Sequence, residues 1–255
     1  MSPVAMITFT SDFGTRYAAA VRGALLAVSD ERVVDVTHDL PRWSVVGAAF
    51  WVDQLLRGYP AGVHLIAVDP GRGASTETVI GVVGEHRLVG PDTGVCWPVA
   101  QTLARRTGAS PSWYLHRADP SPFPTRDVRA PLAGALAADP SDVLGTVDRI
   151  DTPTRLRLPE GALTEEGATG EVITTDRFGN VITSIPAAFA EAAADTAVLI
   201  GGAMATVVGA HSAPETGALV VTVGEHGRIE LVLGGASAAD RLGLGPGDPL
   251  RIQRV

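Results

Sequence analysis

The chain has 255 residues, of which 45% are hydrophobic and 19% charged, with a formal net charge of −8 and one cysteine. This composition excludes an intrinsically disordered chain, and the acidic balance makes nucleic acids and anionic membranes poor partners. No apolar run reaches the roughly 18 residues that span a bilayer and no signal-peptide pattern opens the chain. The lone cysteine excludes an internal disulfide, so we expect a cytoplasmic protein.

The N-terminal part alternates predicted strands and helices. Apolar runs predict strands at 4–9, 33–36 and 63–68, and helical patterns lie between them at about 16–28 and 43–56. Further along we predict short strands at 79–83 and 87–89, a turn at 91–94 and a helix at 128–137. Alternation of strand and helix is typical of a parallel sheet with right-handed crossovers, so we expect an α/β domain.

The C-terminal part contains only short strand-like runs, most of them separated by turns with Gly, Asp or Pro. They lie at 171–174, 180–184, 197–200, 204–208, 218–223, 228–233 and 249–254. This spacing predicts a small all-β barrel or sandwich. Turn-forming residues predominate before it, so we expect an N-terminal domain of residues 1–150, a linker of residues 151–169 and a C-terminal domain of residues 170–255.

Polar residues follow the first three predicted strands. Asp12 follows the first, Thr37-His38-Asp39 the second and Asp69 the third, where Pro70 and Gly71 come next. Because parallel strands end at one edge of a sheet, these groups are expected to meet in one crevice. Asp69 by itself is more typical of a turn before proline, but three strand ends in succession favour a binding cleft. Carboxylates there suit a neutral diol or a cationic ligand and repel phosphates.

Several common chemistries lack their sequence patterns. The chain has no Gly-x-x-x-x-Gly-Lys phosphate loop, no complete dinucleotide fingerprint and no Gly-x-Ser-x-Gly nucleophile elbow. Its six histidines show no paired spacing for zinc, so we expect no metal site. His64 lies within an apolar strand and is interpreted as a buried core histidine.

Six short motifs occur in order along most of the chain. They are Thr10-Ser11-Asp12-Phe13-Gly14, Asp35-Val36-Thr37-His38, Val68-Asp69-Pro70-Gly71, Gly90-Pro91-Asp92-Thr93-Gly94, Arg126-Asp127-Val128-x-Ala130-Pro131 and Gly170-Glu171-Val172-x-x-x-Asp176-Arg177-Phe178-Gly179-Asn180. Together they resemble the S-adenosyl-L-methionine (SAM) hydrolase and fluorinase/chlorinase superfamily. The resemblance implies an N-terminal α/β domain, a C-terminal β-barrel and a homotrimer. It also implies substrate sites between one subunit's N-terminal domain and its neighbour's C-terminal domain.

The resemblance also implies roles for individual residues. Asp12 would bind the ribose 2′- and 3′-hydroxyls, Asp176 and Asn180 the methionine ammonium and carboxylate, and Phe178 would pack on the adenine. The other substrate-binding residues that it implies are Phe13, Trp43, Phe123, Glu225 and Gly235. SAM would be the substrate, and no cofactor or metal would be needed because its sulfonium is already activated. From the residues alone, 176–180 also fits a hairpin turn, and Glu225 fits an exposed turn residue.

The chain departs from the family's hydrolases at the nucleophile pocket. Of their Asp-Arg-His set only the acid remains, as Asp69, while Thr76 and Pro124 stand at the expected Arg and His positions. Arg72 or Arg126 is a candidate for the missing cation.

Two positions resemble the halogenases instead. Trp43 stands at a Trp position typical of them, and Thr125 stands where fluorinase has a halide-contacting Ser. An ionised Asp69 would repel a halide by roughly 4 kcal/mol at 4 Å with a dielectric near 20, whereas neutral water meets no such penalty. We therefore predict SAM hydrolysis, with catalytic residues Asp69, Thr125 and Thr76. The alternatives are a halogenase, another 5′-adenosyl transfer, and a protein that binds SAM or adenosine without turnover.

Overall fold

The computed structural model describes residues 6–68, 77–210 and 214–255. The chain divides into two compact units, Met1–Arg157 and Leu158–Val255, and each unit contains a hydrophobic core of its own. The limits that we predicted for the two domains, at residues 150 and 170, stay a prediction.

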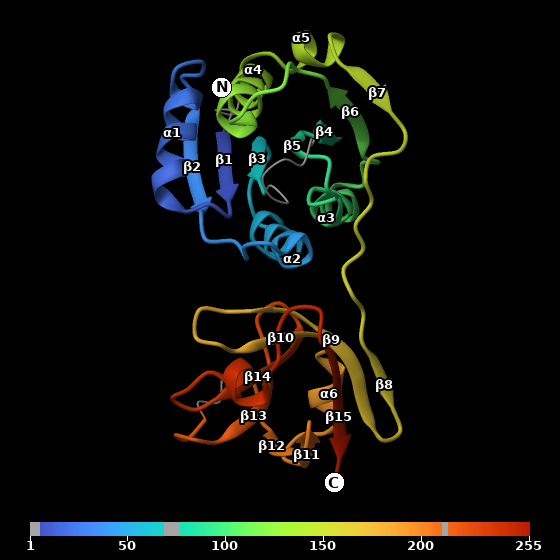
Figure 1. Ribbon diagram of the computed structural model, residues 1–255. Coiled ribbons are helices and arrows are strands. Elements are labelled where there is room, and N and C mark those ends of the chain that lie inside the picture. The colour runs from blue at the N-terminus through green and yellow to red at the C-terminus, as the bar shows by residue number, and fades with distance from the viewer. Residues whose placement is uncertain (1–5, 69–76, 211–213) are drawn as a thin grey trace. The chain divides into compact units, whose positions relative to one another are not determined.

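A seven-stranded sheet in the order β2-β1-β3-β5-β4-β6-β7 forms the centre of the N-terminal unit (Figure 1). In chain order its strands are β1 (Met6–Ser11), β2 (Arg32–Thr37), β3 (Val63–Ala67), β4 (Thr78–Val83), β5 (His86–Pro91), β6 (Ser112–His116) and β7 (Asp148–Ile150). Strand β1 pairs in parallel with β2 and β3, and β3 with β5, which confirms the predicted parallel sheet. Strand β4 runs antiparallel to β5 because only Gly84 and Glu85 join them, too short a link for a crossover.

Helices cover both faces of this sheet. They are α1 (Gly14–Leu26), α2 (Val45–Leu56), α3 (Trp97–Thr107), the π-helical turn η1 (Thr125–Arg129), α4 (Ala130–Ala138) and α5 (Pro140–Gly145). Helices α1 and α4 pack together over one face, where Phe9, Leu25, Leu65 and Leu136 are fully buried in one cluster. Helices α2 and α3 pack against each other, and a contact between α3 and His86 places α3 on the opposite face.

A chain of hydrogen-bonded polar side chains, buried at Thr8, His64 and His86, connects β1, β3 and β5 to α3. Thr8 Oγ1 lies 2.8 Å from His64 Nδ1, His64 Nε2 lies 2.9 Å from His86 Nδ1, and His86 Nε2 lies 2.9 Å from an amine of Arg106. A guanidinium can only donate, so His86 accepts at Nε2 and donates to His64, which in turn donates to Thr8. His64 is fully buried and hydrogen-bonded at both nitrogens, which confirms its interpretation as a core histidine.

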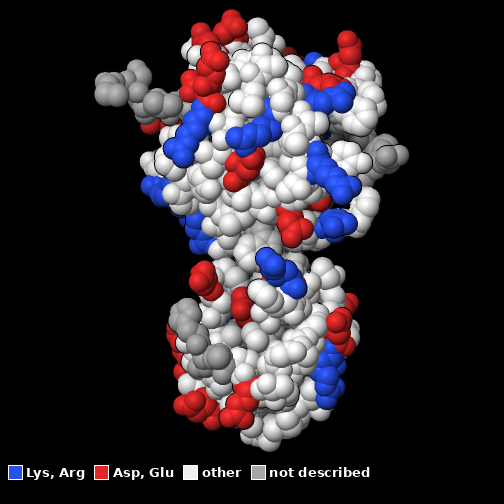
Figure 2. All heavy atoms as spheres, turned by 90° about the vertical axis from the view of Figure 1, so that its left-hand side faces the viewer, with Lys and Arg blue, Asp and Glu red and all other residues white. Residues whose placement is uncertain are grey.

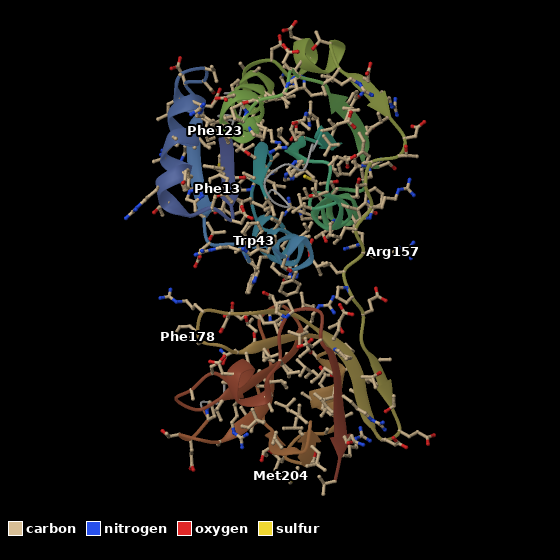
Figure 3. The ribbon with its side chains drawn as sticks, viewed as in Figure 1. Phe13, Trp43, Phe123, Arg157, Phe178 and Met204 are labelled. Carbon is tan, nitrogen blue, oxygen red and sulfur yellow. The ribbon has the colours of Figure 1, made fainter. Side chains whose placement is uncertain are left out.

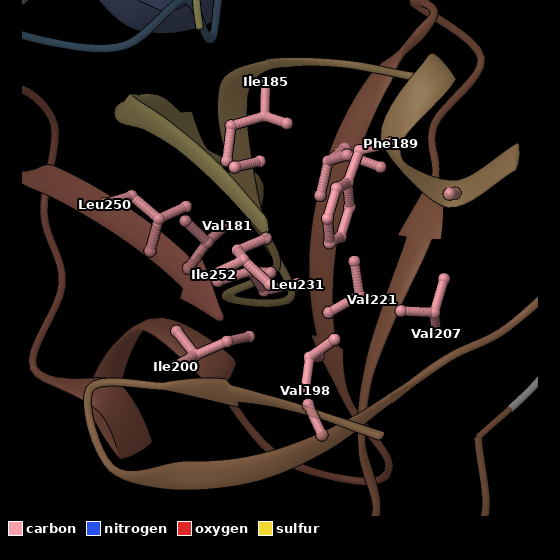
Figure 4. Close-up of a cluster of buried hydrophobic side chains, with 14 of the residues drawn as sticks. Val181, Ile185, Phe189, Val198, Ile200, Val207, Val221, Leu231, Leu250 and Ile252 are labelled. Carbon is pink, nitrogen blue, oxygen red and sulfur yellow. The ribbon is translucent and has the colours of Figure 1, made fainter. Parts of the chain in front are cut away.

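The C-terminal unit is a closed β-barrel, as predicted. Its strands are β8 (Ala162–Thr164), β9 (Gly167–Thr175), β10 (Val181–Pro186), β11 (Ala197–Ile200), β12 (Ala203–Val207), β13 (Leu219–Val223), β14 (Arg228–Leu233) and β15 (Pro249–Arg254). The ring runs β10-β14-β13-β12-β11-β15-β9 and closes through the β9–β10 pair, with β8 added outside on β9. Figure 4 shows the aliphatic side chains and Phe189 that fill it. Two short helices, α6 (Ala188–Ala192) and α7 (Ala238–Leu242), interrupt the strands, and α6 delivers Phe189.

Candidate functional site

The candidate site of the N-terminal unit lies where β1, β2, β3 and β5 end. These strands are mutually parallel, and Ser11 is paired with Ala67 while Thr10 is paired with Thr37, so their ends are level. We call this side of the sheet the carboxyl edge. It places Asp12 beside the end of β2, as the strand-end argument predicts. Asp69 and Thr76, which follow β3, lie outside the described residues.

The ends of β1 and β2 are tied together at the carboxyl edge. Ser11 Oγ lies 2.9 Å from His38 Nδ1, the His38 carbonyl accepts from the Gly14 N–H at 2.9 Å, and the Ser11 carbonyl accepts from the Leu40 N–H at 3.1 Å. The pairing shifts by one residue after Phe9, a bulge of the kind found beside active sites. These bonds hold the backbone on both sides of Asp12, which is half-buried.

Three aromatic residues of the N-terminal unit are labelled in Figure 3: Phe13, which comes just after β1, Trp43, which lies between β2 and α2, and Phe123, which precedes η1. Phe13 precedes α1 and packs against Phe9 with 6.2 Å between ring centroids. Trp43 is 79% exposed and has a φ of 62°, a backbone region that a non-glycine residue occupies at a cost. Phe123 is 53% exposed. Strained backbone of this kind is often found at functional sites, and the binding role of Trp43 stays a prediction.

The turn η1 brings Thr125 to this edge and, with it, Arg129. Arg129 donates to Thr125 Oγ1 at 3.1 Å and to Thr78 Oγ1 at 3.3 Å, and all three side chains are buried. Thr78 begins β4 opposite Pro91, the last residue of β5, so the contact lies at the carboxyl edge. Arg129 occupies the unspecified position of the fifth motif and was not predicted from the sequence, because arginines are mostly exposed.

Arg126, one of the two arginines predicted as candidates for the missing cation, is exposed to solvent. Its Nε donates to Asp127 at 2.6 Å, and its guanidinium stacks over Phe123 at 4.5 Å from the ring centroid. Hydrogen bonds from Arg126 and from Ser121 lower the pKa of Asp127. Arg72 lies outside the described residues. The described cation that is buried beside Thr125 is therefore Arg129.

Two hydroxyls at the carboxyl edge lack a hydrogen-bond partner within the described part of the chain. They are Oγ1 of Thr10, near the end of β1, and Oγ1 of Thr93, just after β5, and both atoms are buried. Buried polar groups are almost always hydrogen-bonded, so unsatisfied ones gather where a ligand or water completes them. Among the described residues no group of three or more His, Cys, Asp and Glu side chains could hold a metal ion.

The N-terminal unit also contains a cavity that does not include the predicted site residues. A cavity of about 160 Å³ is lined by Trp97, Trp113 and Arg155 among others, and no predicted site residue lines it. The stacked indole rings of Trp97 and Trp113 lie 5.8 Å apart, and the Arg155 guanidinium lies over the Trp97 ring.

On the face shown in Figure 2, acidic and basic side chains intermingle and do not separate by sign. No helix in the described ranges has the length and apolar character needed to cross a membrane.

In the C-terminal unit, Asp176, Phe178 and Asn180 share the turn between β9 and β10. Asp176 Oδ1 accepts from the N–H groups of Phe178 at 2.8 Å and Asn180 at 2.9 Å, and Oδ2 accepts from Asn180 Nδ2 at 2.9 Å. The hairpin interpretation is therefore confirmed, and it leaves the Phe178 ring 69% exposed. The binding roles of Asp176, Phe178 and Asn180 stay predictions.

Of the two remaining predicted residues, Gly235 lies near this turn and Glu225 does not. Gly235 follows β14 with a φ of 74°, two residues before Ser237, against which Gly179 packs so closely that a Cβ there would lie 2.2 Å from Oγ. Glu225 is exposed in the β13–β14 turn, at the opposite end of β14. The structure thus brings Gly235 to Asp176 and Asn180 and separates Glu225 from them.

The chain matches known proteins over nearly its whole length. Residues 7–144 match the N-terminal domain of the SAM hydroxide adenosyltransferase family, and residues 170–251 match its C-terminal domain. A relative from Salinispora tropica, named (R)-S-adenosyl-L-methionine hydrolase, is 34% identical over 260 residues, with 99% of both chains covered. A relative of the same name from Thermus thermophilus is 35% identical, with 96% of this chain and 98% of the relative covered.

Solved structures show the same fold. A protein of Thermotoga maritima superposes with a TM-score of 0.79 at 26% identity, covering 98% of this chain and 100% of its own. A protein of Thermus thermophilus superposes with a TM-score of 0.74 at 32% identity, covering 97% of this chain and 99% of its own. Both family domains and both full-length relatives lead to one assignment: the chain belongs to the SAM hydroxide adenosyltransferase family.

Proposed function

We propose that the protein hydrolyses SAM by attack of water on the ribose C5′, releasing adenosine and L-methionine. The observation that carries the proposal is the 34% identity, over 99% of both chains, to a relative named (R)-S-adenosyl-L-methionine hydrolase. The water oxygen forms a bond to C5′ while the C5′–S⁺ bond breaks and its electron pair stays on sulfur, and the water loses a proton. SAM is the substrate in this proposal. Because its sulfonium leaves as a neutral thioether, it needs no further activation, and the proposed displacement uses no cofactor.

Residues of the carboxyl edge would hold the nucleoside and the water. Asp12 would accept hydrogen bonds from both ribose hydroxyls, a bidentate charge-assisted arrangement that suits a diol. Asp69 would orient the water and accept its proton, Thr125 would give that water a second hydrogen bond, and Thr76 would belong to the same pocket. Orientation of this kind would supply several kcal/mol of rate enhancement. The aromatic residues Phe13, Trp43 and Phe123 would provide apolar contact with the substrate.

Residues of the barrel would hold the two ends of the substrate. Asp176 and Asn180 would bind the methionine ammonium and carboxylate, Phe178 would pack on the adenine, and Gly235 would let the backbone approach closely. Glu225 keeps a proposed binding role, at a different end of β14 from this group. We further propose a cytoplasmic homotrimer in which residues of one subunit's N-terminal domain meet those of a neighbour's C-terminal domain, as the family resemblance implies.

Hydrolysis is favoured over the three alternatives by the names of the relatives, and over the halogenase also by charge. Both full-length relatives above are named as hydrolases, and an ionised Asp69 would repel a halide. Incubation with SAM, with and without chloride or fluoride, followed by chromatography and mass spectrometry, tests the proposal. Adenosine and methionine are expected under every condition. A 5′-halo nucleoside would indicate a halogenase, and binding without product would indicate a SAM-binding protein.

A further inference from the structure

Arg129 is the largest fully buried side chain among the described residues. A guanidinium keeps its charge at every physiological pH, and its transfer out of water costs several kcal/mol. A buried ion is poor at stabilising a fold, because apolar side chains of similar volume often do as well or better. The neighbouring Ala130, Leu132, Ala133 and Leu136 are indeed apolar and buried. Stability alone therefore does not account for an arginine at this position.

The guanidinium determines how the Thr125 hydroxyl is used. Arginine has only donors, so Thr125 Oγ1 must accept the 3.1 Å hydrogen bond from Arg129. The hydroxyl hydrogen of Thr125 then points away from Arg129 and is donated in another direction. A second bond, from Arg129 Nε to Thr78 Oγ1 at 3.3 Å, fixes the guanidinium against the first residue of β4. The two threonines thus contribute to holding the guanidinium in one orientation.

The backbone supports this arrangement. Residues 125–129 form a π-helical turn, in which the N–H of Ala130 bonds to the carbonyl of Thr125. Such turns are rare in proteins, and many of those that occur lie at functional sites. The turn directs both Thr125 and Arg129 into the interior, whereas Arg126 and Asp127 face solvent. Helix α1, which begins just after Asp12 and Phe13, packs against the same turn.

We propose that Arg129 is a positioning residue for the hydrolysis, which holds the Thr125 hydroxyl as a hydrogen-bond donor toward the attacking water. The inference rests on the proposed function and adds a residue to it. Arg129 touches neither substrate nor water in this account, and it acts through Thr125. Removal of the guanidinium should therefore slow turnover with little effect on SAM binding.

The test is a double-mutant cycle with Arg129→Met and Thr125→Val, read as kcat and KM for SAM and as melting temperature. Each single variant is expected to lose about 10- to 100-fold in kcat, the usual effect of one charge-assisted hydrogen bond, with KM changed less than about threefold. The double variant should be no slower than the slower single one, because both changes remove the same contact. Arg129→Lys keeps the charge and is expected to recover part of the lost kcat.

Arg106→Met is the matched control. This arginine also donates to a buried histidine, His86, and to the Tyr59 carbonyl, but it lies on α3 away from the carboxyl edge. It should lower the melting temperature without lowering kcat. Wild-type kcat in Arg129→Met, or losses that multiply in the double variant, would overturn the positioning role while leaving hydrolysis in place. A wild-type protein that releases no adenosine would overturn the proposed function itself, and this inference with it.

Discussion

Asp176 and Asn180 are joined by two hydrogen bonds, from the backbone and the side-chain nitrogen of Asn180 to the two carboxylate oxygens, both at 2.9 Å. Because a carboxylate accepts only, the Asn180 nitrogen must face Asp176 and its amide oxygen must face away. Three of the roughly four acceptor positions on Asp176 are used within the turn. One acceptor on Oδ2 remains for a ligand, which suits a single ammonium N–H.

Asp176→Asn should therefore weaken SAM binding without weakening adenosine binding. The change removes the negative charge that would face the methionine ammonium but keeps the size of the side chain. We expect the Kd for SAM to rise about 10- to 100-fold, as for loss of one hydrogen bond to a charged group, with the Kd for adenosine unchanged. Isothermal titration calorimetry measures both. Equal weakening of the two ligands, together with a lower melting temperature, would show that Asp176 serves the turn alone.

Asp12→Ala should weaken SAM and adenosine alike, because both carry the ribose diol. The sharper measurement compares adenosine with 2′-deoxyadenosine. In the wild-type protein, loss of the 2′-hydroxyl is expected to cost about tenfold or more in affinity, the usual effect of one hydrogen bond to a charged group. In Asp12→Ala that difference between the ligands should disappear. If it persists in full, Asp12 does not bind the 2′-hydroxyl.

His64 should make the fold sensitive to acid. Burial, with the neighbouring His86 and Arg106, lowers the pKa of His64 from 6.5 to about 3. Between these values the unfolded chain binds a proton at this residue that the folded chain does not, so the free energy of unfolding falls as the pH drops. At pH 5 the loss from His64 is about 2 kcal/mol.

Urea denaturation at pH 7, 6 and 5 measures this loss, with His64→Gln as the control. The variant has no titrating group at the position, so its stability should fall less over the same range. Equal slopes for the two proteins would contradict the pKa assignment. Burial also lowers the pKa of His86, and because both proteins contain His86, it adds to both slopes in the same direction.

The fold could be predicted where periodicity and local signals agree. The alternation of strand and helix up to β3 corresponds to the N-terminal unit, and the short strands beyond residue 170 correspond to the C-terminal unit. Helix α3 was missed although its signals are present: a proline at its start, Arg105 and Arg106 in its last turn, and Gly108 with a φ of 73° after it. Helices α6 and α7 have only five residues each, too few to show a helical period in the sequence.

The candidate site could be predicted in part. Strand-end polarity was enough to indicate Asp12, because parallel strands must end on one edge. Arg129 could not be found this way, since its burial depends on a π-helical turn and on Thr78, which lies 51 residues earlier in the chain. Separation of Glu225 from Asp176 depends in the same way on the pairing of β14, which no local pattern specifies.

Cys96 should be unreactive in the folded protein. Burial, together with nearby Asp92, raises the pKa of its thiol from 9.0 to about 12, against an opposing influence from Arg129. At pH 8 the thiolate, which is the reactive form, is then about a thousandfold less populated than in an unperturbed cysteine. Ellman's reagent at pH 8 should show no fast reaction before unfolding and one equivalent in guanidinium chloride. A fast reaction of the native protein would contradict the buried placement.

The most direct test of SAM hydrolysis is turnover in ¹⁸O-labelled water. Attack on C5′ forms a new bond between the water oxygen and that carbon, so the label should appear in the 5′-hydroxyl of adenosine and not in methionine. Mass spectrometry of the separated products measures both. Labelled adenosine and unlabelled methionine are the predicted result. Unlabelled adenosine, or a labelled amino-acid product formed together with a thioether nucleoside, would contradict attack at C5′.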